Sequence, residues 1–510
     1  MLIYKIIFLF HITIKKLFKY DLRPILIRSI YSTGVKNFFQ TKKFNSEEFE
    51  KKIDDAYKIF EKNKDKRLLW DCHRLDFLNN NEMSFEKKIN ALLFWIDSGP
   101  VFQKIIFENM MECSLRASNI LFFIKNNEDK IDQRNKKILL RYLKKTYILN
   151  FICPDMYIKR NKIFISEQSN NHFIFCMCYQ IIYLDFVKGL KNSYLKTKIK
   201  YFEKKFSNDG FLMEGSTFYS YSVSNAILKV LFIVNKHDYL PKYKRLAQAV
   251  DSLNCPELDL KNLNFGDKDD SILLPSLDED YAFIRFQKIT FSNKKNFLSD
   301  NIHLFRYEDI KIILNGRNIY NYGTNGHYHD DYGHFNLYTN KKIILDPGTK
   351  SYTEPGARYD GAEYHNAPFA KNSNSMTSNK SFEKKFNSEI SKSISANHIL
   401  ITRNDSSGEW SRKIHYSTPF IEDSFKFNDE SYIKIYFVDK PTFIEEKERL
   451  KTFKVNNLLI SLSCSQLFNY NVRKTMFSPH YSELKNAYIL EMFFNKNLYH
   501  KLKWDFVCEN

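Results

Sequence analysis

Cysteine is scarce in this sequence, and its spacing excludes the patterns typical of cysteine-rich metal sites and disulfide scaffolds. Eight of the 510 residues are cysteine, and none of them are paired at the spacing of metal ligands. Cys176 and Cys178 stand two apart in an apolar run, so a helix would point them to different faces. We expect most of the cysteines to be buried thiols and we expect no disulfide framework.

Long apolar runs are also lacking. The chain opens with "MLIYKIIFLFHITIKKLFKY", in which about nine mostly apolar residues follow a basic one. This run is shorter than the ~20 residues of a transmembrane helix, so we expect no transmembrane span. A histidine within it, a following Lys-Lys and the lack of a small-residue cleavage site leave no clear signal peptide. Residues 1–44 are expected to form a basic and apolar segment that docks on the protein or on a membrane surface. Bacterial periplasm or cell envelope is favoured over cytoplasm.

The charge balance points to a polyanionic partner. Lysine and arginine number 78 against 59 aspartate and glutamate, a formal net charge of +19. Nucleic acid, acidic polysaccharide and anionic membrane all suit such a charge. The lysines are spread along the chain, however, and no helix or zinc-finger motif for nucleic-acid binding is present. We therefore expect no nucleic-acid partner, and the sequence does not indicate an oligomeric state.

Length and periodicity predict a multidomain chain with helices first and strands second. A content of 43% hydrophobic and 16% aromatic residues is sufficient for large cores. Residues 45–252 show helical periodicity in runs separated by short polar breaks, like a stack of helical hairpins. The runs cover residues 46–63, 85–99, 114–127, 135–152, 170–190 and 215–237. Residues 253–280 lack any period and are the expected linker. Residues 281–510 alternate between apolar and polar positions, which predicts an antiparallel β-sandwich. The predicted strands cover residues 281–292, 302–316, 334–346, 394–403, 432–439, 456–464 and 488–494.

The segment "GHYHDDYGHFNLYTNKKIILDPGTKSY" (326–352) concentrates histidines and acids beside a hairpin signal. Histidine moves protons near neutral pH and also binds metals. Two histidines and a carboxylate suit Zn²⁺ or a similar divalent ion, and the candidate ligands are His329, Asp346 and His365. His327 would then be left for proton transfer.

Strand geometry limits this metal hypothesis. If Asn340-Lys341 forms a two-residue turn, Asp346 lies opposite Phe335, and His329 is roughly 20 Å farther along an extended strand. The metal site therefore requires the chain to bend around residues 330–334, which Gly333 permits. The alternative is a set of hydrogen-bonded histidines at a domain interface.

The helical half contains a second group of polar residues. "SNNH" (169–172) opens a predicted helix, so Asn171 and His172 lie at a helix start, where backbone N–H groups favour anions. "NDGFLMEGSTFY" (208–219) follows, with Glu214 and Tyr219 beside small residues. Asn-His at a helix start more often only caps the helix, and a tyrosine beside small residues usually packs, so neither group alone indicates a function.

Taken together, these motifs resemble the heparinase II/III-like polysaccharide lyase family. The matching stretches are "HYHDD", "ILDPGTKSY" and "YHN" in the β half and "NNHFIF" and "NDGFLMEGSTFY" in the helical half. "WDCHRLDFLNN" and "SLRASNILFFI" also resemble the N-terminal region of that family. The matches extend from about residue 70 to 370 in the family's order. The resemblance implies an N-terminal (α/α) toroid followed by a C-terminal antiparallel β-sandwich, with the active site at their junction.

The resemblance also implies roles for individual residues. Asn171 would polarise a substrate carboxylate, His172 or Tyr219 would be the base, Tyr219 the first choice for the acid, and His327 would complete the active site. A structural zinc ion would be held by His329, Asp346 and His365. Candidate substrate-binding residues are Arg116, Asn119, Glu214 and Tyr359, although an arginine on the inner face of a toroid is as often structural. Tyr359, in "ARYD", would correspond to a family tyrosine near the substrate, and the segment before His365 is shorter here than in the family.

The expected function is β-elimination on an acidic, uronic-acid-containing polysaccharide. One alternative is a catalytically silent glycan-binding protein of envelope polysaccharide assembly, since a fold does not fix an activity. A second is a zinc-dependent hydrolase that uses residues 329, 346 and 365. The sequence does not distinguish a heparan-like, an alginate-like or a capsular substrate.

Overall fold

The protein consists of two compact units that are interleaved along the chain. The computed structural model describes residues 73–79, 82–98, 110–152, 171–253, 263, 265–267, 297–298, 301–317, 327–351, 359–373, 376–380, 383–479, 481 and 483–509. The first unit comprises Met1–Glu203, Ser222–Tyr243 and Ser271–Lys288, and the second comprises Lys204–Tyr221, Lys244–Asp270 and Ile289–Asn510. The predicted N-terminal segment 1–44, the first predicted helix at 46–63 and the first predicted strand at 281–292 lie outside the described residues.

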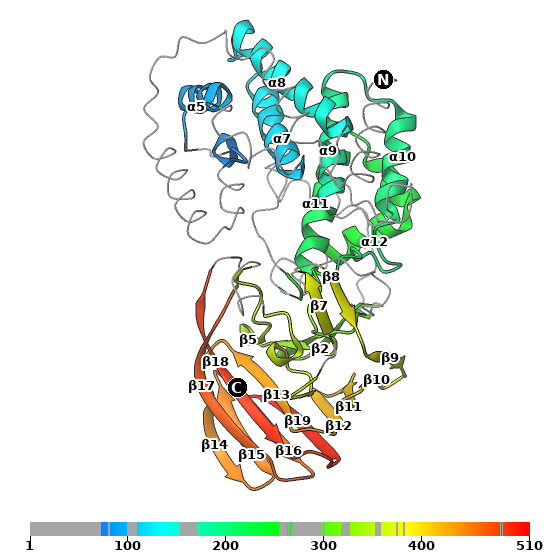
Figure 1. The fold of residues 1–510 in the computed structure, drawn as a ribbon, viewed down its shortest axis with the longest axis vertical. Coiled ribbons are helices and arrows are strands. Elements are labelled where there is room, and N and C mark those ends of the chain that lie inside the picture. Colours follow the sequence, from blue (N-terminus) through cyan, green and yellow to red (C-terminus); the bar gives the residue numbers. More distant parts are fainter. Residues whose placement is uncertain are drawn as a thin grey trace. The chain divides into compact units, whose positions relative to one another are not determined.

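The N-terminal half is helical and the C-terminal half is built from antiparallel sheets, as the sequence predicts (Figure 1). This confirms the expected order of an (α/α) toroid followed by a β-sandwich. The helices are η1 (Asp76–Asn79), α5 (Phe85–Ser98), α7 (Met110–Asn126), α8 (Gln133–Ile152), α9 (Asn171–Phe186), α10 (Asn192–Glu203), α11 (Thr217–Ile233), η2 (His237–Lys242) and α12 (Lys244–Leu253). Among these described helices, none combines the length and the hydropathy needed to cross a bilayer.

Helix α7 is the central element of the helical unit. Every residue from Met110 to Ile124 is buried, because α8, α9 and η1 all pack against this helix. Its polar residues are therefore paired within the protein; the Arg74 guanidinium, for example, donates to both carboxylate oxygens of Glu112 at 2.5 and 2.7 Å. Helix α9 begins at Asn171, as predicted, and is buried from Ile174 to Tyr183. Helices α10 and α12, which the sequence analysis did not predict, have one apolar face each.

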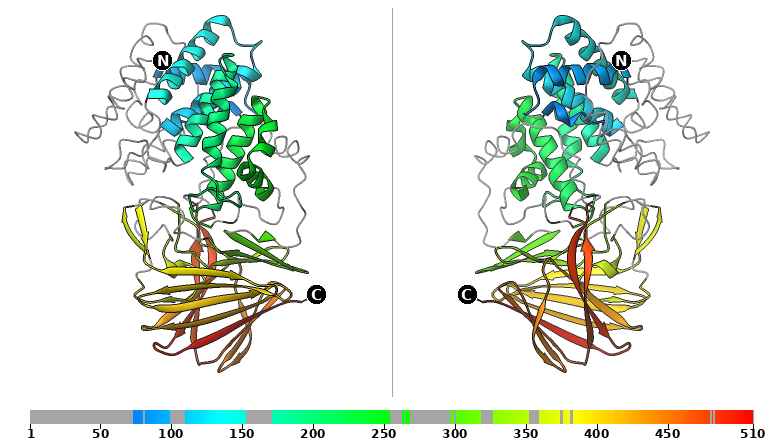
Figure 2. Two further views of the ribbon diagram at one scale, coloured as in Figure 1. Left: turned by 90° about the vertical axis from the view of Figure 1, so that its right-hand side faces the viewer. Right: turned by 90° about the vertical axis from the view of Figure 1, so that its left-hand side faces the viewer.

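The second unit contains two antiparallel sheets that face each other across one core (Figure 2). The first has the order β1-β2-β3-β4-β5-β13-β18-β17, with β6 also pairing with β13, and the second has the order β14-β15-β16-β19-β12-β11-β10-β9; β7 and β8 form a separate hairpin. The strands are β1 (Phe297–Leu298), β2 (Ile302–Tyr307), β3 (Ile310–Asn315), β4 (Phe335–Tyr338), β5 (Lys342–Leu345), β6 (Phe369–Ala370), β7 (Met376–Lys380), β8 (Glu383–Phe386), β9 (Glu389–Ile394), β10 (His398–Asp405), β11 (Gly408–His415), β12 (Phe420–Phe427), β13 (Ser431–Phe437), β14 (Thr442–Lys447), β15 (Leu450–Val455), β16 (Leu458–Cys464), β17 (Asn469–Phe477), β18 (Lys485–Phe494) and β19 (His500–Cys508).

Alternation of side chains explains the sandwich core. Strand β19 buries every second residue from His500 to Phe506 and exposes those between them. The same pattern on β11, β12 and β16 places Trp410, Phe425 and Ile460 in one core cluster with Phe335 and Ile433 of the facing sheet. Ten described strands of this unit lie wholly outside the predicted ranges: β1, β6, β7, β8, β11, β12, β14, β15, β17 and β19.

Part of the predicted linker belongs to this second unit. Leu263 and Phe265 lie in the range 253–280, yet both are buried in a hydrophobic cluster with Phe211, Ile302 and Leu304. The domain boundaries proposed from the sequence stay a prediction, since 254–262 and 268–280 are outside the described residues. The four described cysteines of α7, α9 and β16 are buried free thiols, and Cys508 is partly exposed.

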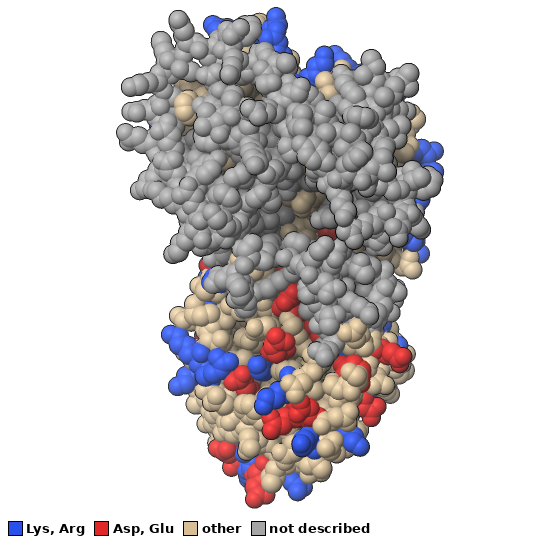
Figure 3. Space-filling model, viewed as in Figure 1, with Lys and Arg blue, Asp and Glu red and all other residues tan. Residues whose placement is uncertain are grey.

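Acidic and basic side chains are intermixed on the sandwich face shown in Figure 3. Ion pairs also occur along the strands of the sandwich: Glu491 on β18 accepts from Arg473 at 3.0 Å and lies 3.4 Å from the Lys434 ammonium. Exposed pairs of this kind contribute only about 0–1 kcal/mol each.

Candidate active site and metal centre

Three chain segments of the second unit interlock through their backbones around His327. The His327 amide donates to the Glu214 carbonyl at 2.8 Å, and the Asp267 amide donates to the His327 carbonyl at 3.1 Å. The Ser216 hydroxyl in turn donates to the Asp267 carbonyl at 2.5 Å. Residues 214–217, 265–267 and 327–331 are therefore held as one body although they are far apart in the sequence.

Two glycines make this close approach possible. Gly215 has a φ of +77°, and a Cβ atom there would lie 1.9 Å from the ring of Tyr328. Gly266 has a φ of +78°, and its Cβ atom would lie 2.4 Å from the Gly215 carbonyl oxygen. A side chain at either position would meet both the left-handed backbone and a filled space.

Tyr219 and His327 form a parallel stack. Their ring centroids are 3.8 Å apart with an angle of 13° between the planes. Tyr219 lies in the first turn of α11, where the Ser216 hydroxyl accepts from the Tyr219 amide at 3.2 Å and so caps the helix. Tyr219 is buried, whereas 11% of the His327 side chain is exposed. The structure thus brings together two of the four predicted catalytic residues.

A buried carboxylate that the sequence analysis did not identify lies between His327 and His329. Asp267 Oδ2 is 2.9 Å from His327 Nδ1, and Asp267 Oδ1 is 3.0 Å from His329 Nε2. The Thr349 hydroxyl also donates to Asp267 Oδ1 at 2.9 Å. Asp267 stands in the segment 253–280, which was predicted to be a linker because it lacks any period, so the sequence held no signal for this residue.

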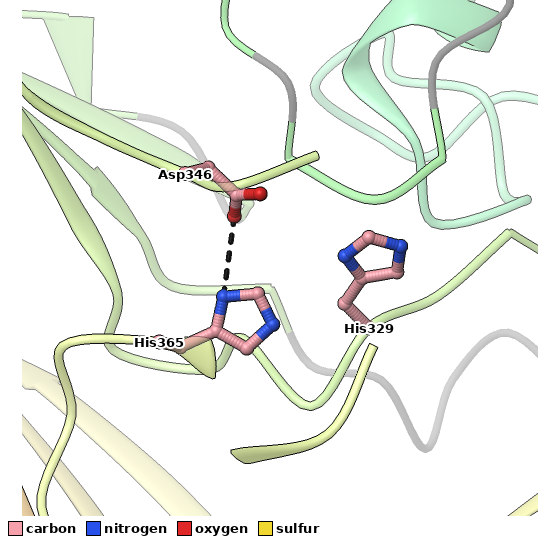
Figure 4. Close-up of side chains that lie close together, drawn as sticks. All are labelled: His329, Asp346 and His365. Atoms are coloured by element: carbon pink, nitrogen blue, oxygen red, sulfur yellow. Dashed lines mark ion pairs between the residues drawn. The ribbon is translucent and has the colours of Figure 1, made fainter. Parts of the chain in front are cut away.

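The three predicted metal ligands converge at a buried point. One ligand atom from each of His329, Asp346 and His365 lies within 4.8 Å of the other two. His365 Nδ1 is 3.2 Å from Asp346 Oδ2, and the His329 ring faces this pair (Figure 4). His329 Nδ1 and His365 Nε2 are buried without a hydrogen-bond partner among the described residues, and Asp346 Oδ2 contacts the side chain of His365 through the ion pair. Buried ligand atoms without hydrogen-bond partners are better explained by a bound ion than by a complete hydrogen-bond network.

The bend required by strand geometry is present. Strands β4 and β5 pair with Leu337 opposite Ile344, a register that places Asp346 beside Phe335 when continued. The turn contains three residues, because an irregularity pairs Tyr338 with Lys342. Residues 327–334 are not in a strand; Gly333 has a φ of +81°. The bend within residues 327–334 brings His329 back to Asp346.

Electrostatics within the cluster favours a charged Asp346. Burial raises the pKa of this carboxyl, but the neighbouring His365, His334 and His329 lower it by more, so the pKa lies below its ordinary value. Burial lowers the pKa of His365, and the Asp346 carboxylate more than offsets this, so the pKa is raised. His334 differs, because burial lowers its pKa to about 3 and keeps the ring neutral.

Buried arginines hold the acids of the "HYHDD" motif. Arg403 of β10 donates to both oxygens of Asp330, at 2.6 and 3.1 Å. Arg317 donates to Asp331 at 2.5 Å. Arg412 of β11 donates to the Gly333 carbonyl at 2.7 Å. These two acids therefore fix the loop to the sandwich, a role that the sequence analysis did not assign to them.

The remaining predicted site residues are described in their own surroundings. Asn171 and His172 are the first residues of α9 in the helical unit; Asn171 is buried and His172 is partly exposed. Glu214 is buried and precedes the Gly215 turn. Tyr359 has a left-handed backbone with a φ of +53°, and its ring lies 5.2 Å from that of Tyr364.

Arg116 and Asn119 are fully buried in α7 and hold the segment before η1. Arg116 donates to the His73 carbonyl at 2.5 Å, and its guanidinium lies 4.7 Å from the centre of the Trp95 ring. Asn119 donates to the Arg74 carbonyl at 2.9 Å. These contacts are of the structural kind that the sequence analysis gave as the alternative to substrate binding, which stays a prediction.

Comparison with known proteins identifies the fold. No family model and no curated protein sequence matches this chain. Among solved structures, a heparinase III crystal structure covers 96% of this chain and 85% of its own, with a TM-score of 0.61 and 12% identity. A heparinase III with methylated lysines covers 94% of this chain and 84% of its own, with a TM-score of 0.59 and 13% identity. A mutant of the heparan sulfate lyase HepC from Pedobacter heparinus covers 95% and 83%, with a TM-score of 0.53 and 14% identity. The toroid and sandwich of this chain thus have the fold of heparinase III.

Proposed function

We propose that this chain is a polysaccharide lyase that cleaves an acidic, uronic-acid-containing polymer by β-elimination. The observation that carries the proposal is the stacked Tyr219–His327 pair, in which 11% of the histidine side chain is exposed, in a chain that has the fold of heparinase III. A fold alone does not establish an activity, so the chemistry of these residues has to support it.

The reaction sets clear requirements. A base removes the proton at C5 of the uronate, the C5–H electron pair forms the C4–C5 double bond, and the C4–O bond breaks. The leaving oxygen then takes a proton from an acid. Because the C5 proton is weakly acidic, the adjacent carboxylate must be neutralised or hydrogen-bonded as negative charge develops on it.

The predicted residues have the groups that these steps need. An amide such as that of Asn171 can donate to the substrate carboxylate. The Tyr219 hydroxyl is the first choice for the acid, and His172 or Tyr219 serves as the base. His327 fixes the Tyr219 ring by stacking and presents its own edge to the substrate. Glu214 and Tyr359 are proposed to orient and contact the sugar.

We further propose that His329, Asp346 and His365 hold a structural zinc ion. The donor set has the nitrogen and oxygen ligands that zinc prefers, and its orphaned buried atoms converge within 4.8 Å. When bound, the ion would supply a fixed positive charge that ties the 327–334 loop to β5 and to residue 365. His327 is separated from His329 by one residue, so a fixed His329 also restricts where His327 can lie.

The net charge supports an acidic polymer as partner, at +19 for the whole chain. A silent glycan-binding protein would not need an acid–base pair. A zinc hydrolase would use the 329/346/365 group for chemistry rather than for structure.

An ultraviolet time course with a panel of uronic-acid polysaccharides tests the proposal. The wild type should give a rising signal from the conjugated C4–C5 double bond, and Asn171→Ala and Tyr219→Phe should lower kcat at least ~100-fold, the contribution typical of a proton-transfer group. Both variants should keep the melting temperature of the wild type. Reducing ends that increase without absorbance would contradict the lyase and favour the hydrolase. A flat trace over the whole panel, with measurable binding of a polymer, would favour the silent binder.

A further inference from the structure

Asp267 contacts two histidines that have different proposed tasks. Its Oδ2 atom lies 2.9 Å from Nδ1 of His327, the residue proposed to face the substrate. Its Oδ1 atom lies 3.0 Å from Nε2 of His329, a proposed zinc ligand. The carboxylate is completely buried, so both contacts are made out of contact with bulk water.

The chemistry of a carboxylate decides which ring nitrogens carry protons. An ionised carboxylate only accepts hydrogen bonds, and a neutral imidazole has one N–H and one lone pair. With an ionised carboxylate and neutral rings, the nitrogen that faces Asp267 carries the N–H in each ring; a lone pair there would leave two buried acceptors facing each other. The Thr349 hydroxyl lies 2.9 Å from the same Oδ1 atom, to which it can donate, and its oxygen lies 3.2 Å from His329 Nε2, from which it can accept.

The two histidines contact Asp267 through different ring nitrogens, so their protons and lone pairs are placed in opposite ways. His327 would carry its proton on Nδ1, which leaves the lone pair of the ring on Nε2. His329 would carry its proton on Nε2, which leaves Nδ1 with a lone pair. That Nδ1 atom is buried and has no hydrogen-bond partner among the described residues, and it is the nitrogen that faces the Asp346–His365 pair.

We propose that Asp267 is a positioning residue that sets the tautomers of His327 and His329 in opposite senses, so that one carboxylate prepares His327 for the substrate and His329 for the metal. The proposal extends the lyase function and the zinc site proposed above to a residue outside their motifs. Carboxylate–histidine pairs of this type orient metal ligands and raise their basicity.

The backbone supports this role, because it fixes the carboxylate to the loop that it acts on. The Asp267 amide donates to the His327 carbonyl, and its own carbonyl accepts from Ser216. Asp267 therefore cannot shift relative to His327 without breaking the hydrogen bonds that join the three segments.

Neutron crystallography of the full chain tests the assignment directly. In deuterated crystals grown above the ordinary pKa of histidine, a deuteron is expected on Nδ1 of His327 and on Nε2 of His329, each directed at Asp267. A deuteron on Nε2 of His327 or on Nδ1 of His329 would overturn the proposal. This result does not depend on any turnover, so it stands apart from a failure of the lyase function.

The Asp267→Asn substitution gives a second test with zinc alone as the probe. An asparagine has one acceptor oxygen and one NH2 group, so it can accept from only one of the two N–H groups. Zinc affinity, measured by competition with a chelator, is expected to fall 10–100-fold, the usual effect of losing such a partner. Asp209→Asn is the matched control: Asp209 accepts from Asn301 in the same unit but does not contact either histidine, and zinc affinity should be unchanged.

Unchanged zinc affinity in folded Asp267→Asn protein would overturn the proposal for His329. If a substrate is found, kcat of Asp267→Asn should fall with little change in KM, while Asp209→Asn keeps both constants. Should Asp267→Asn fail to fold, the deuteron positions in the wild type still decide the question.

Discussion

The ion pair between Arg412 and Asp423 is expected to be the most sensitive charged contact in the sandwich core. Both side chains are fully buried, and the guanidinium donates to the two carboxylate oxygens at 2.7 Å each. Trp504 Nε1 also donates to Asp423 at 2.8 Å. The remaining Arg412 donors bond Gly333 and Asn366. The pair thus joins the core to the loops that carry the candidate metal ligands.

Asp423→Asn should destabilise the protein by about 3–5 kcal/mol, because it leaves a guanidinium in the core without its counter-charge. The amide NH2 would in addition face donors of Arg412 or Trp504. The assay is urea unfolding followed by tryptophan fluorescence, since Trp410 and Trp504 both lie in the sandwich core. Arg473→Met, which removes an exposed ion pair, is the control and should shift the midpoint little.

A double substitution gives the refuting comparison. Arg412→Met together with Asp423→Leu removes both charges, so it should cost less than Asp423→Asn alone. Two results would contradict this reasoning: a loss below about 1 kcal/mol for Asp423→Asn, or a double variant that loses as much stability as Arg412→Met and Asp423→Leu together. Either would show that the buried ion pair does not determine the stability of this part of the core.

Three further predictions concern the site and its surroundings. Gly215→Ala should lower the free energy of unfolding by at least ~1 kcal/mol in a thermal melt, because the residue has φ +77° and its Cβ would meet the Tyr328 ring. Gly189→Ala is the control and should be neutral, because its Cβ would have no contact closer than 3.6 Å. Equal effects of the two substitutions would contradict the geometry. Burial lowers the pKa of His303 to about 3, so below pH 6.5 the unfolded state binds a proton that the folded state does not. The free energy of unfolding should therefore fall by about 2 kcal/mol from pH 7 to pH 5. Urea unfolding of His303→Leu at the same two pH values should lack this part of the decrease. Zinc at one hundred times its Kd should stabilise the wild type by about 2.7 kcal/mol in calorimetry and should not stabilise His365→Ala; equal stabilisation of both would place the ion elsewhere.

The sequence predicted the order of the two halves because their periods differ. Strand ranges that alternate cleanly, such as 302–316 and 334–346, match hairpins of the structure. Strands β14 and β17 were missed because their residues are largely exposed and polar, which leaves no apolar alternation to detect. Helix α10 was missed for a related reason, since only three of its twelve residues are buried.

The site could be predicted only where its residues stand in recognisable motifs. His329, Asp346 and His365 converge as expected, and Tyr219 meets His327. The partners that hold these residues come from distant strands and from the segment taken as a linker, and no local pattern connects them. Asp267 is the clearest case: its contacts with residues 60 and 62 positions away arise only from the tertiary fold.

The mass of the reaction products is the measurement that tests the central claim most directly. β-Elimination divides the polymer without adding water, so the two product fragments should together have the mass of the substrate, and one should carry the unsaturated uronate. Mass spectrometry of wild-type digests should show this balance, and the Tyr219→Phe control should form the same products at least ~100-fold more slowly. Products that together contain one additional water would contradict the lyase and establish hydrolysis.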